Sequence, residues 1–586
     1  MNRPRRFGEM EYSMKRKFVQ LAACGLASAL ALSLTAALPT ASAAREEQTI
    51  RVGYYYGTGA LDGANLANET GSGFRLGYFN SANEFVQLAS TADKSISVVK
   101  TENVYYGTYN NYTSYHDAAV SGTVVGCYHL ELPGSYATAQ EAQLAVNNYE
   151  DGFVAWIQGA FYARVGNFTN RADAEKRQAE LNGTGSGQTG GLDGLYAVGA
   201  DNQTVALGDD AYLIDESGDI VPAGGSGGAK ATIVGTSAYG VSVVDTGTNH
   251  ILFQYDDGGA GTGLGVAPNA AGDDGTDYET WFKGYTRKGC FRYQRLNGGD
   301  LTVVGVMGVE DYVKGVVPYE MSNSWPRETL KAGAVCARTY VLANLGRHKS
   351  YGFDLCSSSH CQVYYGTNRA GANSDAAVDE TAGEVATYNG AYIDAVYYSS
   401  NGGASIDSSI PWGGNQSYYP YLVGVKDPYE ALVADQISGY EWTRTYTGNQ
   451  LRDVVRDAGY ASCSTVVSAE IAAYTDAGLP RQIRFTDADG KAYTISTTSL
   501  VKWFGLRSYN YWFGEEYKEP EESEPAESEG PVSSVHTADE NGNLTISGRG
   551  WGHNVGLSQW GAYAQGLEGR TYKEILSFYY TGITVG

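Results

Sequence analysis

The stretch Val316-Val317-Pro318-Tyr319-Glu320-Met321-Ser322-Asn323-Ser324-Trp325-Pro326 carries the most information about the fold of this chain. Apolar residues follow it at steps of four, three, four and four, namely Leu330, Ala334, Ala337, Val341 and Leu345. That spacing predicts a helix that buries one face, and Pro326 suits a first helical turn. We therefore expect Glu320 on a loop just ahead of a long buried helix.

Two interpretations of Glu320 follow from this position. A glutamate near a helix start is ordinarily a solvated group that complements the helix dipole. Burial against Tyr319, Met321 and Trp325 would instead raise its pKa and suit it to donate a proton. The helix N-terminus would lower the same pKa, and the sequence leaves open which effect is larger.

Length and composition bound the class of protein. A chain of 586 residues predicts three or four folding units. The 41 Lys and Arg against 65 Asp and Glu give a net charge of −24, which repels phosphate backbones, so nucleic acid is not an expected partner. The 47 tyrosines and 76 glycines are typical of extracytoplasmic surfaces, where tyrosine stacks on sugar rings.

The N-terminus has the pattern of an export signal. Lys15-Arg16-Lys17 precedes a mostly apolar run from Phe18 to Leu38, and Ala41-Ser42-Ala43 offers a cleavage site. We predict a signal peptide over residues 1–44, with an uncleaved membrane anchor as the alternative. In either case the protein is exported, to the cell wall or the extracellular face of the membrane.

Two modules are expected before the helix. Residues 45–145 hold short Tyr- and Val-rich runs broken by Gly and Asn, which predict a β-rich module of unknown role. Residues 146–275 contain a strand-like run, Phe161 to Phe168, and a helix that Asn170 would cap. This strand, cap and helix resemble a SPOR domain, a module whose family binds peptide-denuded glycan strands; a generic α+β unit is the alternative.

A third region runs from 284 to 586. It opens with an alternating strand, Leu301 to Met307, before the expected helix. Residues 515–533 are an acidic Pro/Ser/Glu stretch without apolar residues to bury, so we expect a disordered insertion. The fold class is α+β multidomain, with a mixed α/β catalytic domain built around the long buried helix.

Three soft metal ligands lie within six residues, as Cys356, His360 and Cys361, and His348 precedes them. Zinc accepts such a set in tetrahedral geometry, and four protein ligands would make the site structural. A disulfide between Cys356 and Cys361 is the alternative in an exported protein.

The helix stretch, from Val316 through Leu330-Lys331-Ala332-Gly333-Ala334-Val335-Cys336-Ala337-Arg338-Thr339-Tyr340, resembles the signature of the sporulation stage II protein D and amidase-enhancer family. Further segments resemble the same family: Gln362-Val363-Tyr364, Tyr398 to Gly403, and Gly552-His553-Asn554-Val555-Gly556-Leu557-Ser558-Gln559, where Asn554 and Leu557 depart from the usual Gly and Met. Without the resemblance, the glycine-rich runs would be interpreted as turns.

The resemblance implies that Glu320 is the catalytic acid of a lytic transglycosylase. It also implies a zinc cluster, since some members carry one between the helix and the Gln-Val-Tyr. The residues that it implies along the sugar-binding groove are Gln362, Tyr398, Ser400, Gly402, Gly403, His553, Ser558 and Gln559.

The expected substrate is therefore the glycan strand of peptidoglycan, including strands already denuded of peptide. Two alternatives remain open: a non-catalytic enhancer of a partner cell-wall amidase, and a wall protein that only holds glycan. A serine hydrolase is not supported, because no Gly-x-Ser-x-Gly elbow sits on a predicted strand-to-helix turn.

Overall fold

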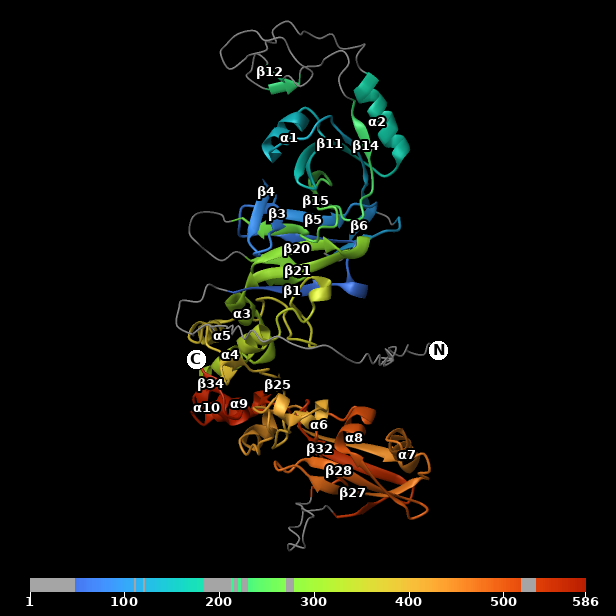
Figure 1. Ribbon diagram of the computed structural model, residues 1–586, viewed down its shortest axis with the longest axis vertical. Helices are drawn as coiled ribbons and strands as arrows, with labels where there is room; N and C mark the ends of the chain where they lie inside the picture. The colour runs from blue at the N-terminus through green and yellow to red at the C-terminus, as the bar shows by residue number, and fades with distance from the viewer. Residues whose placement is uncertain are drawn as a thin grey trace, which may run out of the picture. The chain divides into compact units, whose positions relative to one another are not determined.

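The computed structural model describes residues 48–109, 112–119, 122–183, 212–214, 220–222, 230–269, 279–517 and 534–586 (Figure 1). These residues form a mixed α+β structure, which confirms the α+β part of the predicted fold class. The predicted signal segment and residues 518–533 of the predicted acidic insertion lie outside the described residues. Within the described part of the chain, every helix is too short or too polar to cross a bilayer.

The first sheet joins residues from both sides of the expected boundary at 284. Strand β1 pairs antiparallel with β21, from Thr49 opposite Gly308 to Tyr55 opposite Val303. The alternating pattern identifies such strands but carries no information about their partners. In order, the seven strands are β22 (Leu355–Cys356), β1 (Thr49–Tyr55), β21 (Leu301–Gly308), β20 (Cys290–Arg295), β17 (Leu264–Pro268), β3 (Phe74–Phe79) and β4 (Phe85–Thr91).

The second sheet has ten strands and likewise spans the expected boundaries. In order, they are β14 (Thr232–Val234), β9 (Tyr128–Glu131), β11 (Ala160–Phe168), β10 (Gly152–Ile157), β16 (Ile251–Asp256), β15 (Val241–Asp245), β5 (Ser95–Lys100), β2 (Gly63–Ala67), β18 (Thr280–Phe282) and β19 (Tyr285–Arg287). Smaller strands form separate hairpin sheets, namely β6 (Val104–Tyr109), β7 (Tyr112–His116), β8 (Thr123–Val125), β12 (Tyr212–Ile214) and β13 (Ile220–Pro222).

Six elements of this region form a β-α-β-β-α-β unit. In chain order they are β9, α1 (Ala139–Val146), β10, β11, α2 (Arg171–Gly183) and β14. Their strands lie in the order β14-β9-β11-β10, and each neighbouring pair is antiparallel, which is the split β-α-β arrangement. The predicted strand and helix are both present, and the Asn170 side chain accepts a hydrogen bond from the Asp173 amide at 3.0 Å.

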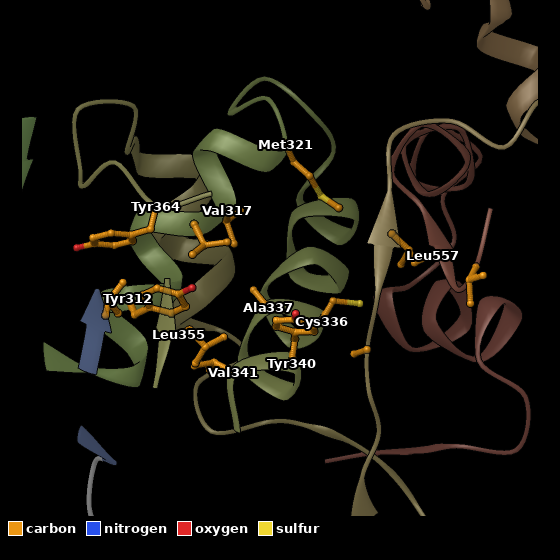
Figure 2. Packing of buried hydrophobic residues seen from close by; sticks show 14 of the residues in the cluster. Tyr312, Val317, Met321, Cys336, Ala337, Tyr340, Val341, Leu355, Tyr364 and Leu557 are labelled. Carbon is orange, nitrogen blue, oxygen red and sulfur yellow. The ribbon is translucent and has the colours of Figure 1, made fainter. Parts of the chain in front are cut away.

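Strand β21 leads directly into the helical core. Helix α3 (Val309–Glu320) follows it, and α4 (Arg327–Ala343) packs against α3, α5 (Ala372–Asp379), α9 (Gln559–Leu567) and α10 (Tyr572–Tyr579). Figure 2 shows Val317 and Met321 of the α3 segment turned toward α4, which presents Ala337 and Val341 in the same cluster. Helix α4 ends at Ala343, so the expected helix, whose last apolar position was Leu345, is too long; Leu345 is 38 % exposed.

Residues 441–549 form two further sheets, and the sequence did not predict them separately from the rest of the region 284–586. One sheet has the order β29-β28-β27-β31 and the other β26-β32-β30. Their elements are β26 (Glu441–Thr447), α7 (Gly448–Asp457), β27 (Val466–Tyr474), β28 (Pro480–Asp487), β29 (Ala492–Ser496), α8 (Thr497–Phe504), β30 (Asn510–Phe513), β31 (His536–Thr537) and β32 (Asn543–Arg549). The remaining elements are β23 (Ala386–Tyr388), β24 (Ala391–Tyr392), β25 (Tyr397–Tyr398), α6 (Ser409–Trp412), β33 (Leu557–Ser558) and β34 (Thr584–Val585).

A buried ion pair joins α3 to α4. Arg338, whose side chain is 1 % exposed, donates to both carboxylate oxygens of Glu310 at 2.7 and 2.6 Å. It also donates to the carbonyl of Glu384 at 3.0 Å, beyond α5. One guanidinium therefore links three segments around the helical core.

We expect Glu310→Ala to destabilise the protein by about 3 kcal/mol, because it leaves the buried Arg338 charge without its partner. Urea unfolding of the full chain measures this loss. The control is Glu380→Ala, which removes the ion pairs of Arg327 and Lys331 with a carboxylate 47 % exposed to solvent. This variant should unfold at nearly the same urea concentration as the unchanged protein. Equal stability of the two variants would contradict the assignment.

Candidate active site

Glu320 is the last residue of α3 and is half-buried. The Met321 amide, which follows it, still donates to the Val317 carbonyl at 2.8 Å. This position corrects the expected loop ahead of a helix: Pro318 suggests a break, yet α3 continues through it. The carboxyl group therefore stands at the negative end of a helix dipole, which favours its protonated form.

Three donors from distant segments surround the Glu320 carboxylate. The Val363 amide donates to Oε1 at 3.1 Å, and the Gln559 side chain donates to Oε2 at 3.2 Å and to the Glu320 carbonyl at 3.0 Å. Tyr397 contributes a further side-chain hydrogen bond. Burial raises the pKa of Glu320 above its ordinary value of 4.5, although these three hydrogen bonds act to lower it.

Gln362 lies behind the site and is 2 % exposed. It accepts from the Tyr312 hydroxyl at 3.1 Å and donates to the Tyr397 hydroxyl and the Ala337 carbonyl, each at 3.4 Å. Gln362 therefore positions Tyr397 and does not line a groove. Sequence reasoning missed Tyr397 as a site residue, although it directly precedes Tyr398.

The glycine-rich loop that follows β25 is organised around a buried carboxylate, Glu430, which is 0 % exposed. Glu430 accepts from the Ser400 and Ser558 hydroxyls at 2.7 and 2.6 Å, and from the Asn401 and Gly402 amides at 2.8 and 2.7 Å. Burial raises the pKa of Glu430, against these four hydrogen bonds.

Ser400 and Ser558 are fully buried, so neither faces a groove as the resemblance implied. Gly402 has φ +71° and an added Cβ would stand 2.7 Å from the Arg549 carbonyl, which explains the need for glycine there. The Gly403 amide donates to Asn401 at 2.6 Å. No sequence signal marks Glu430, because its partners lie up to 128 residues away.

His553 forms part of an aromatic group beside the site. Its ring lies 5.1 Å from that of Tyr398 and 5.7 Å from that of Trp412, which is 44 % exposed. Burial lowers the pKa of His553 to about 4, so the ring is neutral at pH 7. Its Nδ1 accepts from the Val555 amide at 3.1 Å. Among the residues that the resemblance implied along the groove, Gln559 donates a hydrogen bond to the Glu320 carboxylate. Tyr398 is 5 % exposed and is therefore buried.

The four candidate metal ligands come together. The ligand atoms of His348, Cys356, His360 and Cys361 all lie within 4.8 Å of one another. His348 Nε2 is 3.3 Å from Cys361 Sγ, and His360 Nδ1 is 3.7 and 3.5 Å from the two sulfurs. Tetrahedral zinc with bonds of about 2.0–2.3 Å places its ligand atoms at such spacings. Both cysteines are free in the structure.

A second group of possible ligands is already satisfied by a protein cation. Asp62, Asp117 and Asp300 lie together, but the Lys100 ammonium contacts them at 2.8, 2.6 and 2.6 Å. We interpret this group of three aspartates and one lysine as an ion-pair network between strands.

Comparison with known proteins gives concordant matches. A family described as "Stage II sporulation protein" matches residues 297–388, which include Glu320, Gln362 and the four candidate metal ligands. An uncharacterized protein of Brachyspira hyodysenteriae is 33 % identical over 334 residues, covering 55 % of this chain and 80 % of that protein. The amidase enhancer of Bacillus subtilis is 30 % identical over 298 residues, covering 47 % and 40 %. Stage II sporulation protein D of Bacillus subtilis is 26 % identical over 294 residues, covering 47 % and 74 %.

The raised pKa of Glu320 predicts a pH-dependent stability. The folded protein holds this proton more tightly than the unfolded chain, so its stability falls as pH rises from 4.5 through the raised pKa. We expect Glu320→Gln, which cannot ionise, to melt a few degrees above the unchanged protein at pH 7, with the difference shrinking toward pH 4. Thermal melting across this range measures it, with exposed Glu540→Gln as the control. The same pH profile for Glu320→Gln and the unchanged protein would contradict the assignment.

Proposed function

Because this chain belongs to the stage II sporulation protein D family, which includes amidase enhancers, we propose that it is a lytic transglycosylase acting on the glycan strands of peptidoglycan. The family acts in sporulation and in cell-wall degradation. The observation that carries the proposal is the Glu320 carboxyl group, half-buried at the end of α3 with a raised pKa and three neutral donors. A carboxyl group with a raised pKa keeps its proton to a higher pH than an ordinary glutamate does, and it can deliver that proton to a substrate.

The reaction needs a single carboxyl group. Glu320 gives its proton to the glycosidic oxygen, and that bond to muramic C1 breaks. The muramic C6 hydroxyl attacks C1 and closes a 1,6-anhydro ring, while its proton passes to Glu320. No water is consumed, and the acid returns to its starting state.

The surroundings of Glu320 suit this chemistry. Among the described residues, its hydrogen-bond partners are an amide, a carboxamide and a phenol, with no second carboxylate that would hold water or form an adduct. Glu430 cannot serve as one, because it is fully buried under its own four donors.

The β-α-β-β-α-β unit supports a second part of the proposal, that a SPOR-like module helps to retain the enzyme on glycan. A second binding site on the same strand raises the local concentration of the active site. Export to the cell wall, through the predicted signal segment, would bring the protein to this substrate.

We propose structural zinc at His348, Cys356, His360 and Cys361. The donor set and its spacing fit the metal, and four protein ligands leave no position for a reacting water. Bound zinc would cross-link the end of α4 to the segment that carries Gln362 and Val363. The metal would thereby stabilise the backbone amide that binds Glu320.

We expect purified glycan strands treated with the protein to acquire 1,6-anhydro-muramic ends, detected by mass spectrometry. Glu320→Gln should reduce their rate of formation at least ~100-fold, as loss of a general acid does. Glu540→Gln, at an exposed turn, is the control and should retain full activity.

The alternatives have separate outcomes in the same assay. Absence of anhydro ends with the unchanged protein would reject the enzyme and favour an amidase enhancer or a glycan-holding wall protein. The enhancer is then tested by adding a purified cell-wall amidase. Equal anhydro ends from Glu320→Gln would instead remove Glu320 from its role.

Elemental analysis is expected to find one zinc per chain. Cys356→Ser should lower the zinc content and the melting temperature together, since zinc binding stabilises the folded state. Cys290→Ser, a half-buried cysteine outside the ligand set, is the control and should keep the metal. A Cys356–Cys361 disulfide found by mass spectrometry in zinc-free protein would defeat this assignment.

A further inference from the structure

Tyrosines from three separate segments form a group that includes Tyr319, the residue before Glu320 on α3. Tyr365 lies two residues beyond Val363, the amide donor of Glu320, and Tyr285 comes from β19 of the ten-stranded sheet. The Tyr285 and Tyr365 rings are stacked, with centroids 5.2 Å apart and planes at 18°. The Tyr319 ring meets Tyr365 edge-on at 5.5 Å. Tyr365 is 39 % exposed, so part of this surface faces solvent.

An exposed cation lies on the same surface. The Arg369 guanidinium carbon is 4.8 Å from the centre of the Tyr319 ring. Within the described part of the chain, the ion pairs include no carboxylate for Arg369. In a protein of net charge −24, a guanidinium placed on an aromatic ring without an acidic partner is available to an anionic ligand.

Backbone contacts hold Tyr285 in this position. The Thr367 amide donates to the Thr286 carbonyl at 2.8 Å, and the Thr286 amide donates to the Asn368 side chain at 2.8 Å. Gly366 permits this approach, because an added Cβ would lie 2.0 Å from the Thr286 carbonyl oxygen. The β18–β19 hairpin is therefore fixed to the segment that carries Val363, Tyr365 and Arg369.

We propose that Tyr285, Tyr319, Tyr365 and Arg369 form a subsite for a sugar that bears a carboxylate, next to the bond that Glu320 would cleave. Tyrosine faces bind the apolar faces of sugar rings. The planar guanidinium of Arg369 matches a carboxylate through two parallel hydrogen bonds. This inference rests on the proposed function for its substrate, the muramic residue of a glycan strand.

Two parts of peptidoglycan carry a carboxylate that Arg369 would bind. Muramic acid carries a lactyl carboxylate that is free only when the stem peptide has been removed, whereas a stem peptide carries carboxylates of its own. The lactyl group is attached to the sugar ring, so a ring stacked on the tyrosines brings it to Arg369. The subsite would then favour peptide-denuded strands.

The test measures binding and needs no turnover. In a Glu320→Gln background, calorimetry gives the affinity for three tetrasaccharides: denuded muramic-containing fragments, the same fragments with stem peptides, and neutral chitotetraose. We expect Arg369→Gln to weaken binding of the denuded fragment about tenfold, the value of one charge-assisted contact, and to leave chitotetraose unchanged. Tyr285→Ala should weaken all three, since stacking does not depend on charge.

Arg481→Gln and Tyr460→Ala, both exposed residues within the range 441–549, are the matched controls. If Arg369→Gln weakens binding of the peptide-bearing fragments alone, the bound carboxylate belongs to the stem peptide. The subsite itself would then still stand. Unchanged affinity of Arg369→Gln for both anionic ligands would overturn it. Because no arm requires cleavage, failure of the transglycosylase reaction would leave these results interpretable.

Discussion

The buried carboxylate of Glu430 is the constraint on which the site depends. It binds the turn at Ser400 to Gly402 and, through the Ser558 hydroxyl, the start of α9. Ser558 is also the N-cap of α9, accepting from the Gly561 amide at 3.1 Å. Gln559 is the next residue, so its contact with Glu320 is set by a carboxylate that never meets substrate. A buried charge is retained when donors satisfy it fully, and here four do so.

The protonation of Glu320 follows from three effects of different sign. Burial disfavours its charge, and its place at the C-terminal end of α3 does the same. The hydrogen bonds from Val363, Gln559 and Tyr397 favour the charged form. Burial is the largest of these effects, so the pKa is raised, yet the donors remain in place to receive the carboxylate after proton transfer. The same groups would thus serve both halves of the proposed acid-then-base cycle.

The sequence predicted what local patterns encode. The strand at Leu301, the apolar spacing of α4 and the cap at Asn170 each depend on residues a few positions apart, and each is present. The candidate metal ligands also come together, since they lie within a short span. The predicted position of Glu320 was wrong because the apolar spacing and Pro326 identify only α4, and no helix was predicted before it; the burial of Val316 and Val317 shows that α3 packs through Pro318 to Glu320.

Residues missed by the sequence analysis are those fixed by long-range contacts. Glu430, Tyr397 and Tyr285 act through partners that other strands and loops bring to them, and no spacing rule connects them. The residues matched by the family include the acid and the candidate metal ligands, whereas β19, the Glu430 network and α9 lie outside that match. Of the four residues of the proposed subsite, Tyr319, Tyr365 and Arg369 lie inside that match and Tyr285 lies outside it. Strand β19 therefore belongs to the argument about substrate, because it contributes Tyr285, stacked on Tyr365, to the proposed subsite.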